Sequence, residues 1–395
     1  MNILILTSKL DPDNFRTAEN AKKQILRSDP NSSVTVQDFF SALFPVASRR
    51  LYPSLHAASR KHPDFCRVLS DSTALRAPLI IREAPYFILS IGDLIQKSRA
   101  DIILSTCSAA SQYVSIYKKR TGDSVPLVSC VTESAQTSKW ILAETDAYLA
   151  EGEDAKKRLL KSGVSEEKIF SGGLPVEAAL LQSGRSSHCC HFESISGEYT
   201  SVRNVLILGS DSVYFSQIDR LLTILFENGI HAVVLTGRNR KLCRELHYRH
   251  PEASLVGNVH EVSDYFITAD VIIAPAAESN LVKAICAGRP FFALCPRNRI
   301  LKSHAAYIEQ EEIGSVLKRN TAHNMQRFIR EIKDPMRHSY ECRNMERLRK
   351  EYNPSELYRV LLFVSSHSQE RAIRISHNMK TPSAGLWEAP VGTFR

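Results

Sequence analysis

Two polar residues and a lysine stand at the start of a predicted helix in the second half of the chain. Ser279 and Asn280 precede an apolar run at helical spacing over Leu281–Ala287, and Lys283 lies one turn further along. Because a helix N-terminus attracts anions through its unpaired amide groups, this segment can seat a phosphate, with added charge from Lys283. The simpler alternatives are an N-cap formed by Ser279 or Asn280 and a lysine side chain in water.

The tripeptide Gly237-Arg238-Asn239 stands at the end of another predicted strand, His231–Gly237. Arg238 can pair with a phosphate or stack on a nucleobase, because its guanidinium is planar and always charged. Gly237 and Asn239 can equally form nothing more than the turn into the next helix. The sequence leaves both interpretations open.

Two other patterns invite a chemical interpretation and fail on spacing. The run His188-Cys189-Cys190-His191 offers four metal ligands, but contiguous ligands cannot easily close a tetrahedron around zinc. Ser210 lies outside any Gly-x-Ser-x-Gly spacing, the turn that exposes the nucleophile of a hydrolase. We therefore expect neither a metal site nor a serine hydrolase, and no cofactor.

The elements that must position these residues alternate short β-rich runs with helical stretches, which is typical of parallel sheets with crossover helices. The alternation restarts at Asn204, after a stretch rich in Ser, Gly, His and Cys. It predicts an α/β fold of two doubly wound, Rossmann-like domains that face each other across a cleft. The expected parts are a first domain, a linker, a second domain, a helix crossing back toward the first domain and a disordered tail, at 1–177, 178–202, 203–353, 354–366 and 367–395.

Charge and cysteine usage limit the partners and the compartment. Lys and Arg total 51 against 42 Asp and Glu, and the net charge of +9 favours an anionic membrane surface or a phosphorylated ligand, or is simply a soluble surface. No nucleic-acid-binding pattern accompanies the charge, so nucleic acid is not an expected partner. Nine cysteines without a CxxC pair, short apolar runs and the absence of a signal peptide at Met1 predict a cytoplasmic protein.

A collinear set of segments carries a family resemblance. In the first half it comprises PLVSCVTE, DAY and GLPV, and in the second half LILG, LTGRN, GNV and ADVII, at residues 126–133, 146–148, 173–176, 206–209, 235–239, 257–259 and 269–273. The set resembles the monogalactosyldiacylglycerol synthase family, which includes processive diacylglycerol glucosyltransferases and is related to MurG. The resemblance implies a GT-B fold, a UDP-sugar donor on the C-terminal half and a membrane lipid acceptor on the N-terminal half.

The resemblance also suggests roles for individual residues. Glu133, at the end of a predicted strand, is the first candidate for the catalytic base, and Asp13 is the second. The alternative for a strand-end carboxylate is a helix cap or an ion pair. The residues implied on the donor side are Gly209, Arg238, Asn239, Val259, Ser279, Asn280 and Lys283.

The sequence departs from the family at the catalytic turn and at the ribose. Where the family has a Gly-x-Gly-His turn, this chain reads Asp11-Pro12-Asp13-Asn14, and an asparagine cannot accept a proton from an attacking hydroxyl. The aspartates also repel a pyrophosphate. Lys283 stands where the family has the glutamate that binds the ribose, and a lysine cannot accept hydrogen bonds from a diol.

The resulting prediction is a divergent, inverting glycosyltransferase that moves a hexose from a UDP-sugar to a membrane lipid such as diacylglycerol. The alternative is a catalytically inactive GT-B relative that binds a ligand or a protein. The enzyme is expected at the cytoplasmic membrane face. A basic and aromatic surface for anionic lipid is predicted from Arg49, Arg50, Arg60 and Lys61 with Leu51, Tyr52 and Phe65.

Overall fold

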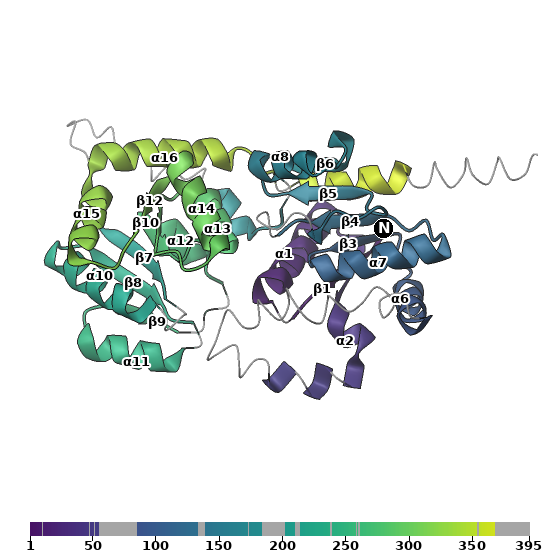
Figure 1. The fold of residues 1–395 in the computed structure, drawn as a ribbon, viewed down its shortest axis with the longest axis horizontal. Coiled ribbons are helices and arrows are strands. Elements are labelled where there is room, and N and C mark those ends of the chain that lie inside the picture. The colour runs from purple at the N-terminus through teal and green to yellow at the C-terminus, as the bar shows by residue number, and fades with distance from the viewer. Residues whose placement is uncertain are drawn as a thin grey trace, which may run out of the picture.

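The computed structural model describes most of the two predicted halves (Figure 1). The described residues are 1–9, 11–46, 48–50, 52–54, 85–132, 139–172, 174–183, 202–209, 214–237, 239–257, 259, 261–353 and 355–367. Glu133, Arg238, Ser210 and the His188–His191 run lie outside them, as does most of the predicted lipid surface.

The first half forms a six-stranded parallel sheet in the order β2-β1-β3-β4-β5-β6. Its strands are β1 Asn2–Thr7, β2 Ser33–Asp38, β3 Ile102–Ser105, β4 Leu127–Cys130, β5 Ala147–Ala150 and β6 Ile169–Ser171. Its helices are α1 Pro12–Ser28, α2 Phe39–Leu43, α6 Pro85–Ser98, α7 Ser108–Thr121, α8 Glu153–Lys161 and the short 3-10 helix η2 Glu166–Lys168. Apolar cores cover both faces, one beneath α1 and one beneath α6 and α7.

The second half repeats the plan in the strand order β12-β11-β10-β7-β8-β9. Its strands are β7 Asn204–Leu208, β8 His231–Leu235, β9 Ser254–Val256, β10 Val271–Ala274, β11 Phe291–Ala293 and β12 Gly314–Val316. Its helices are α10 Phe215–Glu227, α11 Arg240–Arg249, α12 Ser263–Thr268, α13 Glu278–Ala287, α14 Arg299–Gln310, α15 Ala322–Lys333 and α16 Pro335–Arg349.

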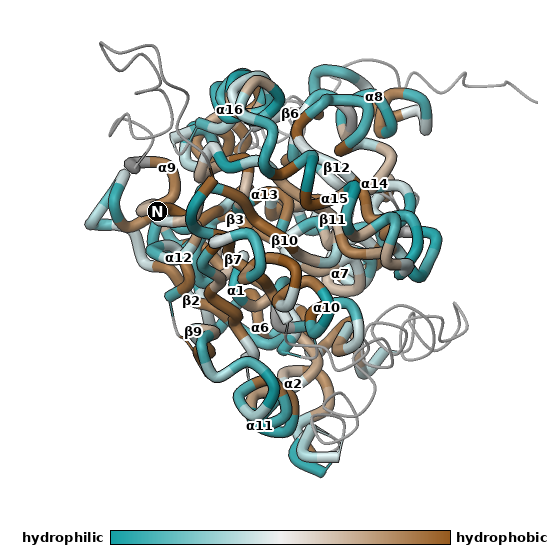
Figure 2. Tube along the Cα trace, turned by 90° about the vertical axis from the view of Figure 1, so that its left-hand side faces the viewer, coloured by the Kyte–Doolittle hydropathy of each residue, from teal (hydrophilic) through white to brown (hydrophobic). Residues whose placement is uncertain are grey.

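Burial on both faces explains why these strands read as nearly continuous apolar runs. Every residue of β3, β4, β5 and β10 is buried, as expected when helices cover both sides of a parallel sheet. Figure 2 shows the same division, with hydrophobic strands such as β3 and β10 inside and hydrophilic stretches on outer helices such as α11. The predicted pair of doubly wound α/β halves is confirmed.

The predicted linker begins with a helix instead of an irregular segment. Residues Ala178–Ser183 form α9, which packs against α12 and α13. Leu180 is completely buried in the core of the second half, together with Val176. The prediction of a linker from residue 178 overlooked this helix, because composition alone does not reveal that Leu180 has a core to join.

The end of the described chain returns to the first sheet. Residues 356–367 are helical, and Leu357, Val360 and Leu361 join the core beneath α1. His367, predicted to be the first residue of the tail, still belongs to this helix. Where the chain crosses back, the Asn353 amide donates to the Gly172 carbonyl over 2.9 Å, which ties the crossing to the end of β6.

No helix in the described part of the chain combines the length and the apolar character needed to span a bilayer.

Candidate functional site

A cleft lies between α1 of the first half and α13 of the second, at the carboxyl ends of both sheets. It is a cavity of about 70 Å³. Its walls come from the start of α1, the end of β4, the segment between β6 and α9, and the start of α13; they are Asp11, Asp13, Asn14, Arg16, Thr17, Asn20, Thr132, Leu174, Pro175, Val176, Glu177, Glu278, Ser279, Val282 and Lys283. Open α/β sheets bind ligands at this kind of edge.

The start of α1 brings two carboxylates to the cleft, and one of them also caps the helix. The Asp11 side chain accepts a hydrogen bond from the Asp13 amide over 2.9 Å, and Pro12 occupies the first helical position. Proline suits that position because its fixed φ is helical and no amide is needed there. The turn that replaces the family's glycines therefore begins a regular helix, with Asp13 in its first turn.

Asp13 reaches across the cleft to α13. The Ser279 hydroxyl donates a hydrogen bond of 2.9 Å to Asp13 Oδ2, although the two residues are 266 positions apart in the sequence. The helix begins earlier than predicted, at Glu278, with Ala277 as an N-cap that makes no side-chain capping bond. The interpretation of Ser279 or Asn280 as the N-cap is therefore wrong. Asn280 lies in the first turn and donates to the Pro275 carbonyl over 3.2 Å.

Lys283 also lines the cleft, one turn along α13 from Ser279. It is half-buried, so the alternative of a lysine in water is wrong. Burial lowers the pKa of Lys283, and the carboxylates of Asp13 and Glu177 act in the opposite direction. Desolvation therefore disfavours the protonated form of Lys283, and the acidic neighbours offset part of that effect.

Asn14 occupies the position of the family's histidine and is held in place by threonines. Its side-chain Oδ1 accepts a hydrogen bond of 2.9 Å from Thr132, and its backbone carbonyl accepts one of 3.1 Å from Thr106. The residue is only 7% exposed. Thr132 lines the cleft and immediately precedes Glu133, whose own position lies outside the described residues.

Gly209, Asn239 and Val259 follow β7, β8 and β9 and are not among the residues that line the cleft. The Asn239 side chain caps α11 by accepting from the Leu242 amide over 3.0 Å. A Cβ atom on Gly209 would lie 2.8 Å from the Ile218 side chain, so this glycine permits close packing of α10 on the sheet. Both residues have structural reasons to be there.

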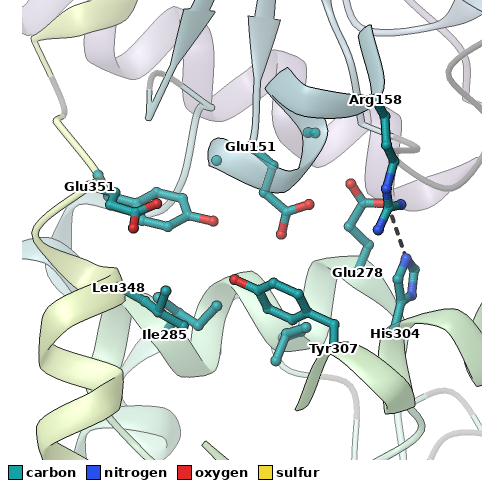
Figure 3. A pocket seen from close by; sticks show the side chains of 12 residues that line it. Glu151, Arg158, Glu278, Ile285, His304, Tyr307, Leu348 and Glu351 are labelled. Atoms are coloured by element: carbon teal, nitrogen blue, oxygen red, sulfur yellow. Dashed lines mark ion pairs between the residues drawn. The ribbon is translucent and has the colours of Figure 1, made fainter. Parts of the chain in front are cut away.

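A second cavity lies on the other side of α13 and was not predicted (Figure 3). Glu151 and Arg158 of the first half face Glu278, His304 and Tyr307 of the second, and Glu278 borders both cavities. The local signal in the sequence was limited to Glu278, a carboxylate immediately before the residues predicted to seat a phosphate. His304 is separated from that turn by a strand and a loop, so its place beside Glu278 was not readable.

The His304 ring has a defined orientation in this second cavity. Its Nδ1 lies 2.9 Å from the Ala276 carbonyl oxygen, and a carbonyl can only accept, so Nδ1 carries a proton. Nε2 then faces Glu278 Oε2 at 3.7 Å, with both side chains buried. This arrangement places a histidine and a carboxylate behind the start of α13. Across the described residues, no group of three or more His, Cys, Asp or Glu side chains is arranged to hold a metal ion.

Comparison with known proteins finds similarity to enzymes that glycosylate lipids. Residues 16–176 match the family model of monogalactosyldiacylglycerol (MGDG) synthase. Processive diacylglycerol beta-glucosyltransferases of Bacillus cereus (strain AH187) and Bacillus anthracis (strain CDC 684 / NRRL 3495) are 23% identical over 233 residues. The chain is a homologue of these diacylglycerol glycosyltransferases. The match covers 57% of this chain and 58% of the length of each relative.

Solved structures of similar shape identify the fold. MurG of Acinetobacter baumannii has a TM-score of 0.60 at 11% identity, and the match covers 93% of this chain and 100% of MurG. UDP-GlcNAc 2-epimerase from Neisseria meningitidis, bound to UDP-GlcNAc, has a TM-score of 0.56 at 15% identity, covering 92% and 98%. Phytolacca americana UGT2, complexed with UDP-2fluoro-glucose and pterostilbene, has a TM-score of 0.58 at 10% identity, covering 93% and 99%. The predicted GT-B fold is confirmed.

Proposed function

We propose that this chain transfers a hexose from a UDP-sugar to a membrane lipid such as diacylglycerol, in the cleft between α1 and α13. The observation that carries the proposal is the convergence of Asp13, Ser279 and Lys283 at one opening between the two sheets. The homologous glucosyltransferases act on diacylglycerol by name, and two structural neighbours were solved with UDP-sugars.

The start of α13 is the proposed seat of the donor diphosphate. The amides at a helix N-terminus point out of the helix and attract an anion, and the N-cap residue Ala277 makes no side-chain capping bond to them. Lys283 adds positive charge on the side of the helix that faces the cleft. Together these groups would stabilise the charge that develops on the departing UDP, without a metal ion.

The proposed reaction is a single inverting displacement. The acceptor hydroxyl oxygen forms a bond to the anomeric carbon while the bond from that carbon to the UDP oxygen breaks, and UDP leaves with the electron pair. The hydroxyl proton passes to a carboxylate. Glu133 is the proposed base, because it follows Thr132 at the cleft wall, and Asp13 is the second candidate. The buried Asn14 has no group that could take the proton.

A second candidate function is a non-catalytic GT-B relative that binds a ligand or a protein. The hydrogen bond between Ser279 and Asp13 favours it, because a carboxylate of the chain already sits at the helix start where a phosphate would bind. Asp11, Glu177 and Glu278 add three more carboxylates around the same cavity, against the cations of Arg16 and Lys283. Because of this repulsion, such a site should bind a diphosphate more weakly than a glycine-rich turn does.

Calorimetric titration with UDP, UDP-glucose, UDP-galactose and UDP-N-acetylglucosamine tests the proposal, together with a UDP-release assay containing diacylglycerol. An enzyme should bind at least one of them with micromolar to millimolar affinity, roughly 4 to 8 kcal/mol. Lys283→Met should weaken binding about fivefold or more, whereas the exposed Lys302→Met on α14 should not. Glu133→Gln should reduce turnover more than affinity.

Two outcomes would decide against the enzyme. Heat from none of the four nucleotides, with no UDP released, would contradict the proposed donor. Binding without any UDP release, unchanged by Glu133→Gln, would instead favour the non-catalytic relative.

A further inference from the structure

The outer side of α11 carries exposed basic and aromatic side chains. Lys241, Arg244 and Tyr248 are spaced three, four and seven residues apart and therefore share one side of the helix. Tyr248 is 89% exposed, more than any other large hydrophobic residue described in the structure. Arg240 flanks these three and is also exposed. We call Arg240, Lys241, Arg244 and Tyr248 the α11 face.

The opposite side of the helix fixes the α11 face rigidly in place. Leu242 and Leu246 are almost completely buried in the core between α10, α11 and the sheet. Asn239 caps the first turn. The face is therefore a preformed surface on a packed element, and ordering it on binding costs only side-chain freedom.

Little of the positive charge on the α11 face is neutralised within the protein. Arg240 and Arg244 have no carboxylate partner among the described residues, and Lys241 has only the solvent-exposed Glu245 at 3.6 Å. The neighbouring Arg249 is different, since it pairs with Asp219 at 3.0 Å and lies over the Phe215 ring. A row of largely uncompensated cations beside an exposed tyrosine complements an anionic surface.

The first half presents further cations at the same end of the molecule. In both Figure 1 and Figure 2, α11 and α2 lie at the lower end, although they belong to different halves. Arg49 and Arg50 follow α2 and are exposed, as is Val46 at 68%. Tyr52 is turned inward, with its hydroxyl donating to Asp38 over 2.5 Å, so it does not belong to this surface.

We propose that the α11 face docks onto an anionic lipid bilayer. A bilayer offers many weak anionic contacts over a broad plane, and tyrosine favours the boundary between headgroups and acyl chains. Non-specific nucleic-acid binding relies on more phosphate contacts, roughly 6 to 10, than the three cations of this face supply. The choice of a bilayer also rests on the proposed function, because a lipid acceptor must be reached at a membrane.

Vesicle flotation at low salt tests the docking. The full chain should float with phosphatidylcholine vesicles that contain phosphatidylglycerol and not with phosphatidylcholine alone. The double variant Lys241→Gln and Arg244→Gln should bind about 30-fold more weakly, about fivefold for each cation removed. Tyr248→Ala should weaken binding without changing its dependence on salt, because it removes interfacial contact and no charge.

A matched control removes one lysine and one arginine from the opposite end of the molecule. Lys157→Gln on α8 and Arg343→Gln on α16 make the same change in net charge, and both side chains are exposed. This pair should bind vesicles within about twofold of the wild type. All of these side chains lie on the surface, so thermal unfolding should change little in any variant.

Three results would overturn the proposal: equal binding to neutral and anionic vesicles, an equal loss in the control pair, or binding to single- or double-stranded DNA oligonucleotides but not to vesicles. UDP titration of the α11 variants separates this inference from the proposed function. Failed docking would leave UDP binding unchanged, and a failure to bind UDP would leave vesicle binding unchanged.

Discussion

Replacing Asp13 by asparagine should strengthen the binding of UDP to the cleft. The amide oxygen of asparagine can still accept the 2.9 Å hydrogen bond from Ser279, so the contact across the cleft is kept while its negative charge is removed. A diphosphate seated at the start of α13 would then meet one carboxylate fewer. The variant thus isolates the charge of Asp13 from its role in packing.

The size of the effect follows from the repulsion that is removed. A unit charge about 5 Å from the carboxylate is repelled by about 1 to 3 kcal/mol when the effective dielectric constant lies between roughly 80 and 20. The cleft opens to solvent, so we expect the lower end, an increase in UDP affinity of roughly five- to tenfold. The same change lowers the pKa of Lys283 further, because Asp13 counteracts the effect of burial. The gain should therefore be largest at neutral or lower pH.

Isothermal titration with UDP at pH 7 measures the change, with Asp93→Asn on α6 as the control. Asp93 is exposed and forms only a surface pair with Lys97, so this substitution makes the same chemical change far from the cleft. Turnover adds a second readout. If Asp13 is the catalytic base, Asp13→Asn should bind UDP more tightly and turn over the UDP-sugar more slowly. If Glu133 is the base, only the affinity for UDP should change. Equal or weaker UDP binding by Asp13→Asn would refute the reasoning.

Further predictions concern stability. Gly172→Ala should lower Tm far more than Gly163→Ala. Both glycines have positive φ, but only at Gly172 would an added Cβ lie 1.8 Å from a backbone oxygen. Gly163→Ala, where the Cβ would meet no atom within 4 Å, should cost about 1 kcal/mol of unfolding free energy. Equal losses would contradict this. Burial raises the pKa of Glu341 to about 7 from an ordinary value of 4.5, so the free energy of unfolding should be highest below that lower value and fall as the pH rises through 7. In urea unfolding at about pH 5 and about pH 8, Glu341→Gln should show a smaller difference in the free energy of unfolding between the two pH values than the wild type. An equal difference in both proteins would contradict this role of Glu341. Lys118→Met should cost roughly 3 kcal/mol in urea unfolding, because it removes the buried ammonium that now lies 2.6 Å from Asp146 and leaves that carboxylate without a counter-charge. A loss below about 1 kcal/mol would show that the pair contributes little.

The sequence alone determined the class and order of the elements. The runs that become β3, β4 and β10 are almost entirely apolar because helices cover both faces of a parallel sheet, so their composition revealed their environment. The start of α13 was placed within three residues, since the apolar spacing that begins at Leu281 is visible locally. For Asn239 the sequence left two interpretations open, and the structure shows it at the turn into the next helix, where its side chain caps α11.

The tertiary structure alone decided which of these residues meet. Asp13 lies on α1 and Ser279 on α13, so their contact depends on how the two halves are placed relative to each other, which no local periodicity records. Lys283 has the sequence context of an ordinary surface lysine, and it is half-buried only because α1 lies opposite. His304 reaches Glu278 because α14 packs behind α13. Hydrophobic patterning indicates which face of a helix or strand is buried. The chemistry of a site between two domains depends instead on contacts that form only when both domains are folded and packed against each other.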